Sequence, residues 1–136
     1  MLHPTLNIKV KHRRGKYFFT HKPYNYDLEW SIVKEYFYWK HPRVLEIGSL
    51  QGNSACWMID NLDLISIDCV EPFGRRKNVP DKLLFEYNID QSRLSDNSII
   101  RLHQTISDNF FKQNKNTYDL IYVDGSHEYV DVYDDI

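Results

Sequence analysis

The sequence has few cysteines and no long apolar run, and both absences narrow the class of protein. Two cysteines occur, Cys56 and Cys69, each in an apolar segment where a buried thiol is expected rather than a disulfide or a metal ligand. No apolar run approaches the ~20 residues that span a bilayer, and the N-terminus has no signal-peptide apolar core. We therefore expect a cytoplasmic protein that does not enter the membrane.

A strong charge of one sign is also missing. The net charge of −2 gives no electrostatic reason to expect a nucleic-acid partner, and the basic run Lys9 to Lys16 is typical of a solvated hairpin face. The six histidines show no His-x-x-x-His spacing, which argues against a zinc site. With 42% hydrophobic residues, the 136-residue chain can bury one modest core.

What the sequence does contain is an alternation of apolar strands and helical segments. Strands are predicted from Val44, over 64–70, over 98–103 and over 120–123, with helices between them. This alternation predicts an α/β fold, a Rossmann-like doubly wound parallel sheet with helices on both faces. Right-handed crossovers and a reversal after the third strand give the order 3-2-1-4, with ligands bound where the order reverses, between the first and fourth strands.

The first of these strands runs into a glycine turn. Glu46, Gly48 and Gly52 follow the pattern Glu-x-Gly-x-x-x-Gly-x-Ser, and Ser49 and Ser54 belong to the same turn. The glycines can take backbone angles closed to other residues and leave room for a ligand across the turn. The spacing differs from Gly-x-Gly-x-x-Gly, which places a pyrophosphate on a helix N-terminus, so a cofactor without phosphates is favoured.

An acidic residue ends the second strand. In doubly wound folds an acid ~20 residues beyond the glycine turn binds ribose hydroxyls. Glu71 is the candidate, and Asp68, three residues earlier and expected inside the strand, is the alternative.

The fourth strand ends in Asp124-Gly-Ser-His127-Glu-Tyr. Together with the glycine turn, this string resembles the class I S-adenosylmethionine-dependent methyltransferases, and within them the macrocin-type sugar and antibiotic O-methyltransferases. The resemblance implies S-adenosylmethionine as cofactor, held by Glu46, Gly48, Ser49, Gly52, Ser54, Glu71, Ser107 and Asp124. Metal-dependent relatives of similar fold have a Mg²⁺ ligand at the position of Asp124 and a general base at that of His127, so the resemblance also makes Asp124 a candidate ligand for Mg²⁺ as a second cofactor.

Several of these roles have structural alternatives. An imidazole can take a hydroxyl proton at neutral pH, so His127 is the candidate base, with Asp124 beside it as the second catalytic residue. His127 could instead brace the following helix, and Asp124 could cap the turn. Ser107 matches the serine of an adenine-contacting Gly-x-Ser, with Thr105 at the glycine position, or it caps a helix that begins at Asp108.

The chain is expected to divide into an N-terminal segment over 1–26 and a partial S-adenosylmethionine-binding methyltransferase domain over 27–136. Residues 7–10 and 17–20 are expected to pair as a hairpin around Arg14-Gly15. From Asp27, as N-cap, a helix is expected to pack an apolar stripe onto the sheet; the stripe comprises Leu28, Ile32, Val33, Tyr36, Phe37 and Trp39.

The expected function is O-methylation of a small hydroxylated acceptor, such as a sugar or natural product. A non-catalytic remnant domain and a nicotinamide-dependent oxidoreductase are the rivals. Because the sequence stops at Ile136 within an expected helix, we also expect the domain to lack strands 5 to 7, about 60 residues or two strand–helix units. The apolar strand 120–123 would then be an exposed edge that self-associates or pairs with a partner supplying the missing strands.

Overall fold

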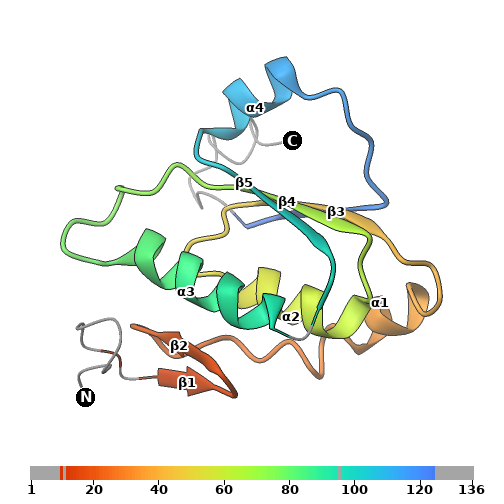
Figure 1. Ribbon diagram of the computed structural model, residues 1–136, viewed down its shortest axis with the longest axis horizontal. Helices are drawn as coiled ribbons and strands as arrows, with labels where there is room; N and C mark the ends of the chain where they lie inside the picture. The colour runs from red at the N-terminus through yellow and green to blue at the C-terminus, as the bar shows by residue number, and fades with distance from the viewer. Residues whose placement is uncertain (1–9, 11, 95, 125–136) are drawn as a thin grey trace.

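A computed structural model describes residues 10, 12–94 and 96–124 of the chain. A four-stranded parallel sheet forms its centre, and a two-stranded antiparallel hairpin lies beside it (Figure 1). In chain order the elements are β1 (His12–Arg14), β2 (Tyr17–Phe19), α1 (Ser31–Tyr36), β3 (Arg43–Ile47), α2 (Asn53–Leu62), β4 (Ser66–Val70), α3 (Asp81–Arg93), β5 (Ile99–His103), α4 (Ser107–Gln113) and β6 (Leu120–Val123).

The sheet has the strand order β5-β4-β3-β6, which confirms the predicted 3-2-1-4 order and the Rossmann-like fold class. In the central pair, Glu46 of β3 stands opposite Cys69 of β4, and on the other side it stands opposite Tyr122 of β6. All five residues of β4 are buried, as expected of a parallel strand covered on both faces. The chain adds β4 and β5 on one side of β3 and then returns to add β6 on the other side. The strand order therefore reverses between β3 and β6, and the ligand crevice is expected at their carboxyl ends.

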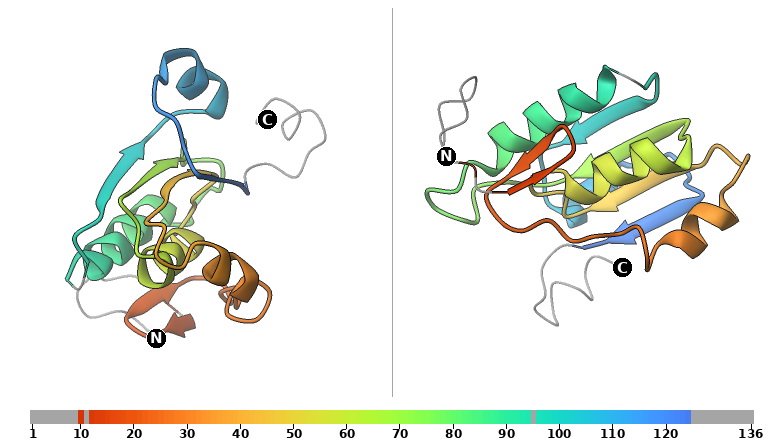
Figure 2. Two further views of the ribbon diagram at one scale, coloured as in Figure 1. Left: turned by 90° about the vertical axis from the view of Figure 1, so that its right-hand side faces the viewer. Right: turned by 90° about the horizontal axis from the view of Figure 1, so that it is seen from below.

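Helices α2 and α3 and the hairpin cover one face of the sheet, and α4 lies on the other (Figures 1 and 2). The larger core lies on the α2 side, where Trp57, Met58 and Ile59 of α2 are almost completely buried against β3 and β4. The smaller core on the α4 side joins Leu45, Ile47, Val70 and Phe110. Because strand side chains alternate between faces, neighbouring residues of one strand belong to different cores.

The predicted helix from Asp27 is wrong in both extent and orientation. Helix α1 begins only at Ser31, and four residues of the expected stripe are exposed: Leu28, Ile32, Tyr36 and Trp39. The other two residues of the stripe, Val33 and Phe37, lie on the inner side together with Trp30. Trp30 sets this orientation, because its ring makes edge contacts with Trp57 and Tyr122 at 5.6 and 4.6 Å between centroids.

Asp27 has another role than the predicted helix cap. Trp30 occupies the N-cap position of α1, while the Asp27 carboxylate accepts a hydrogen bond of 2.8 Å from Trp57 Nε1. This bond joins the segment before α1 to helix α2.

The predicted hairpin exists with shifted bounds. His12 pairs with Phe19 and Arg14 with Tyr17, and Gly15 turns the chain with φ of +59°. Residues 7–9 of the first expected strand lie outside the described residues. The hairpin is fixed to α3 by Asn88, whose amide exchanges hydrogen bonds of 3.0 and 2.9 Å with the backbone of Phe18.

Among the described residues β6 pairs with β3 alone, and Ile121 is 54% exposed. No helix in the described part of the chain combines the length and the apolar character needed to cross a bilayer.

Candidate functional site

The turn between β3 and α2 requires its glycines. Gly48 and Gly52 both have φ of +89°, in the left-handed region that favours glycine. A Cβ at Gly52 would also lie 3.3 Å from the ring of Phe85 in α3, closer than ordinary packing allows. The Gly48 amide donates to the carbonyl of Val70 at 2.9 Å, which ties the turn to the end of β4.

Two cavities open on this turn and share Gly48, Leu50 and Asp124. The first, which we call the Glu71 cavity, has a volume of about 60 Å³ and is lined by Ile47, Gly48, Leu50, Val70, Glu71, Pro72, Arg75, Thr105, Ser107 and Asp124. The second, the strap cavity, has a volume of about 160 Å³ and is lined by His21, Lys22, Tyr24, Tyr26, Gly48, Ser49, Leu50, Gln51, Asn53, Ser54 and Asp124. The residues predicted from the separate motifs therefore meet at the carboxyl ends of β3, β4 and β6.

Glu46 is buried beside the strap cavity with one carboxylate oxygen unsatisfied. Its Oε2 accepts a short hydrogen bond from the Ser54 hydroxyl, whereas Oε1 has no partner among the described residues. Burial raises the pKa of Glu46 to about 7; the hydroxyls of Ser54 and Ser49 act against the shift, and the nearby Asp124 and Glu71 charges add to it. A cationic ligand would relieve this buried, half-ionised group.

Glu71 follows β4 directly and is buried at the wall of the first cavity. Its two carboxylate oxygens accept hydrogen bonds from the backbone amides of Leu50 and Phe73 at 3.1 and 2.8 Å. The first bond supports Leu50, a non-glycine residue with φ of +45°, in the glycine turn. Each carboxylate oxygen has a second lone pair with which it can accept from a ligand hydroxyl.

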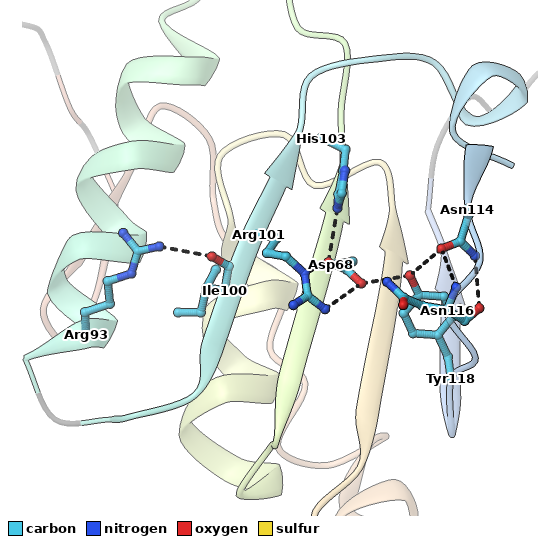
Figure 3. A network of polar contacts seen from close by, with 8 residues as sticks. All are labelled: Asp68, Arg93, Ile100, Arg101, His103, Asn114, Asn116 and Tyr118. Atoms are coloured by element: carbon cyan, nitrogen blue, oxygen red, sulfur yellow. Dashed lines mark hydrogen bonds and ion pairs between the residues drawn. The ribbon is translucent and has the colours of Figure 1, made fainter. Parts of the chain in front are cut away.

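Asp68, the alternative to Glu71, lies inside β4 among polar side chains of β5 and of the segment before β6 (Figure 3). Its carboxylate is buried and has partners on both oxygens: Arg101 at 2.5 and 3.2 Å, His103 Nε2 at 3.1 Å, and the Tyr118 hydroxyl at 2.7 Å. It lines neither cavity. The geometry therefore favours Glu71 for the position facing a ligand.

Thr105 and Ser107 enter the Glu71 cavity from the loop after β5. The alternative role of Ser107 as a helix cap is wrong, because Ile106 occupies the N-cap position of α4 and Ser107 is its first helical residue. Both residues are thus placed where a ligand in this cavity would reach them.

Asp124 follows β6, and its amide donates to the carbonyl of Ile47 at 2.7 Å. The side chain lines both cavities. In the part of the chain that the structure describes, no group of three or more His, Cys, Asp or Glu side chains is arranged to hold a metal ion, so the expected Mg²⁺ site at Asp124 gains no support. His127, the expected base, lies outside the described residues.

Sequence reasoning missed one wall of the site, formed by residues 20–27, which we call the strap. Three side chains of the turn and α2 hold it in place. Gln51 exchanges hydrogen bonds of 3.0 and 2.7 Å with Thr20, Asn53 donates to the Tyr24 carbonyl at 3.2 Å, and Trp57 donates to Asp27. The strap follows no recognisable motif, and its position depends on these long-range bonds.

Comparison with known protein families shows to which family the chain belongs. The sequence profile of a methyltransferase domain family matches residues 45–136, which run from within β3 through the glycine turn and past the end of β6. The chain belongs to this methyltransferase domain family. The class I S-adenosylmethionine-dependent methyltransferase resemblance is therefore confirmed at the level of the family.

A similar solved structure is that of a protein assigned as a sarcosine dimethylglycine methyltransferase from Galdieria sulphuraria. The two chains share 19% sequence identity with a TM-score of 0.48, over 76% of this chain and 40% of that chain. The present chain thus spans less than half the length of this methyltransferase neighbour. No curated protein sequence gives a significant match.

Proposed function

We propose that this chain binds S-adenosylmethionine and transfers its methyl group to a small hydroxylated acceptor. The observation that carries the proposal is the set of three carboxylates, Glu46, Glu71 and Asp124, around one glycine turn whose spacing differs from that of pyrophosphate-binding turns. A sulfonium and an ammonium are attracted to such a site, whereas the pyrophosphate of a dinucleotide is repelled. Membership of the methyltransferase domain family supports the same cofactor.

The two cavities suit the two halves of this cofactor. In the proposal, Glu71 accepts hydrogen bonds from the ribose hydroxyls, and Thr105 and Ser107 lie against the base in the Glu71 cavity. Glu46 Oε1 accepts from the ammonium group on the side of the strap cavity. Gly48 and Gly52 let the ligand cross between the two cavities without meeting a side chain.

When bound, the cofactor supplies an electrophilic methyl group on its sulfonium. The residues of the chain hold donor and acceptor in line and remove the acceptor proton as the new C–O bond forms. His127 is our candidate for the base and Asp124 for its neighbour at the acceptor, on the sequence argument given above. No Mg²⁺ is part of the proposal.

Isothermal titration with S-adenosylhomocysteine, followed by an acceptor screen that detects its formation from S-adenosylmethionine, tests the proposal. We expect S-adenosylhomocysteine to bind. NAD should leave the melting temperature of the chain unchanged. Failure of the folded chain to bind either S-adenosyl nucleoside would overturn it. Binding without turnover of any hydroxylated acceptor would favour the non-catalytic alternative, and activity that survives His127→Ala would remove the base assignment.

A further inference from the structure

The outer side of α1 and its flanking turns carries an exposed apolar surface, which we call the α1 patch. Six large apolar residues of the described chain are more than 60% exposed, and five of them lie between residues 28 and 39. These five make up the patch: Leu28 (82%), Ile32 (71%), Tyr36 (63%), Tyr38 (67%) and Trp39 (74%). Single exposed apolar residues are ordinary on a protein surface, whereas a contiguous group of them marks a binding surface.

The helical backbone gathers these side chains on one side. A helical hydrogen bond already precedes α1, where the Trp30 amide donates to the Tyr26 carbonyl at 2.9 Å. All patch residues except Tyr38 recur every three or four positions, which is the spacing of one helix side. The Tyr38 ring joins them by contacting the ring of Trp39 at 5.1 Å between centroids. Since α1 lies at the margin of the molecule, the patch faces outward (Figures 1 and 2).

The backbone at Trp39 is strained although its ring is exposed. Trp39 follows α1 with φ of +67°, in the left-handed region that bulky residues rarely adopt. Among the described rings, its indole contacts that of Tyr38 alone. Strained residues persist where they have a role, and packing inside the single chain does not supply one for this ring.

The charges around the patch favour a protein as its partner. In residues 28–40, Glu29 and Glu35 balance Lys34 and Lys40. An anionic membrane surface or a nucleic acid attracts an excess of Lys and Arg, which this segment lacks. An apolar surface with both signs of charge around it suits another protein surface of the same kind.

The patch is complementary to itself when two copies run antiparallel. In a twofold-symmetric pair each residue meets a partner residue on the other copy, and that residue meets it in return. With the axis near Lys34, apolar residues face apolar residues and opposite charges face each other. The facing pairs are Leu28 with Trp39, Ile32 with Tyr36, and Glu29 with Lys40.

The area of the patch suits a stable pair. Because an aromatic side chain presents ~150–250 Å², the exposed fractions of the three aromatic residues amount to roughly 400 Å². Leu28 and Ile32 raise the total to roughly 550 Å². Two such surfaces would bury roughly 1,100 Å², which is above the ~1,000 Å² expected of a specific interface.

We propose that the α1 patch is the interface through which two copies of this chain form a twofold-symmetric dimer. The inference is independent of the proposed function. It also differs from the expected association through the edge of β6, because it uses side chains of α1 rather than the backbone of an edge strand.

Sedimentation velocity of the full chain over a range of concentrations tests the dimer. We expect the wild type to pass from monomer to dimer as concentration rises. Ile32→Lys and Trp39→Ser should each weaken dimerisation roughly tenfold or more, because buried aromatic and apolar residues dominate interface affinity. Both residues are exposed in the single chain, so the melting temperature at a concentration where the wild type is monomeric should not change.

Charge reversal tests the antiparallel arrangement. Glu29→Lys alone or Lys40→Glu alone places like charges opposite each other and should weaken the dimer severalfold. The double variant restores opposite charges across the axis and should recover wild-type dimerisation. A double variant as weak as the two single ones would overturn the antiparallel pairing.

Leu94→Lys is the matched control, because Leu94 is 78% exposed at the end of α3, outside the patch. Ile121→Lys tests the β6 edge, and both variants should leave the dimer unchanged. A wild-type chain that stays monomeric at every concentration, or a dimer that survives Ile32→Lys and Trp39→Ser, would overturn the inference. Loss of the dimer in Ile121→Lys alone would overturn it in favour of the β6 edge. A monomer that cosediments with anionic lipid vesicles, and no longer does so with Trp39→Ser, would overturn it in favour of a membrane surface.

Discussion

The two buried carboxylates of the central strands, Asp68 and Glu46, have opposite surroundings. Asp68 faces α4 and receives hydrogen bonds on both oxygens, so although burial would raise its pKa, these bonds outweigh burial and hold the pKa below its usual value. Glu46 faces α2, keeps one oxygen without a partner among the described residues, and has a pKa of about 7. A carboxylate with all its partners supplied by the fold stabilises the fold, whereas one left with a free oxygen is available to a ligand.

The pH dependence of stability should show this contrast most strongly. The folded pKa of Glu46 is raised above its ordinary value of 4.5, so the folded state binds more protons between pH 4.5 and about 7. The free energy of unfolding should therefore fall as pH rises through that window, by on the order of 3 kcal/mol. Urea denaturation of wild type and Glu46→Gln from pH 4.5 to 8 isolates this contribution, because the variant lacks the titrating group.

Asp68 should give the opposite slope. Its lowered pKa contributes stability that is present above its unfolded value, near pH 4, and is lost as pH falls below it. Parallel curves for wild type and Glu46→Gln across the whole range would contradict the assignment of a protonated Glu46.

Substitution of Asp68 should cost stability and leave the ligand site intact. Asp68→Asn removes the negative charge that faces Arg101, while Arg101 and His103 remain partly exposed and can recover some hydration. We expect a loss of about 2 kcal/mol in the free energy of unfolding at pH 7, measured by urea denaturation. The affinity for S-adenosylhomocysteine should change by less than twofold, and a larger change would mean that the Asp68 cluster belongs to the site.

Substitution of Glu46 should give the reverse pattern. Glu46→Gln removes the charge that we propose faces the ammonium and keeps the shape of the side chain. We expect S-adenosylhomocysteine to bind roughly tenfold more weakly, with no loss of stability at pH 7, because the variant no longer buries an unsatisfied charge. Titration calorimetry and a thermal melt measure the two effects, and unchanged affinity would show that Glu46 does not face the ligand.

The sequence allows the sheet and part of this contrast to be predicted. Continuous apolar runs identify buried parallel strands locally, so β3, β4, β5 and β6 lie where they were expected. The choice between Glu71 and Asp68 depends on where β4 ends, and that end at Val70 places Glu71 just beyond the strand. The partners of Asp68 come from β5 and the segment before β6, and no local pattern predicts that they meet.

The strap and α1 could not be predicted for the same physical reason. The apolar residues of 28–39 leave more than one side of the helix able to face the sheet, and the contacts of Trp30 with Trp57 and Tyr122 select the side that carries Val33 and Phe37. His21 lies outside any motif, and the bonds between Thr20 and Gln51, 31 residues apart, bring it to the glycine turn. Long-range packing thus determines the position of the strap, whereas local sequence determines the strands and the glycine turn.

The smallest expected effects come from removing one hydroxyl group that donates a hydrogen bond to each of the two carboxylates. Tyr118→Phe deletes one of several donors to Asp68, so it should cost about 1 kcal/mol in the free energy of unfolding, by urea denaturation at pH 7. Ser54→Ala deletes the hydrogen bond that Glu46 Oε2 accepts from the Ser54 hydroxyl. Because that bond acts against the rise in the Glu46 pKa, its loss should move the pH window of destabilisation upward. If Tyr118→Phe instead moved this window and Ser54→Ala did not, the distinction between a satisfied and an available carboxylate would fail.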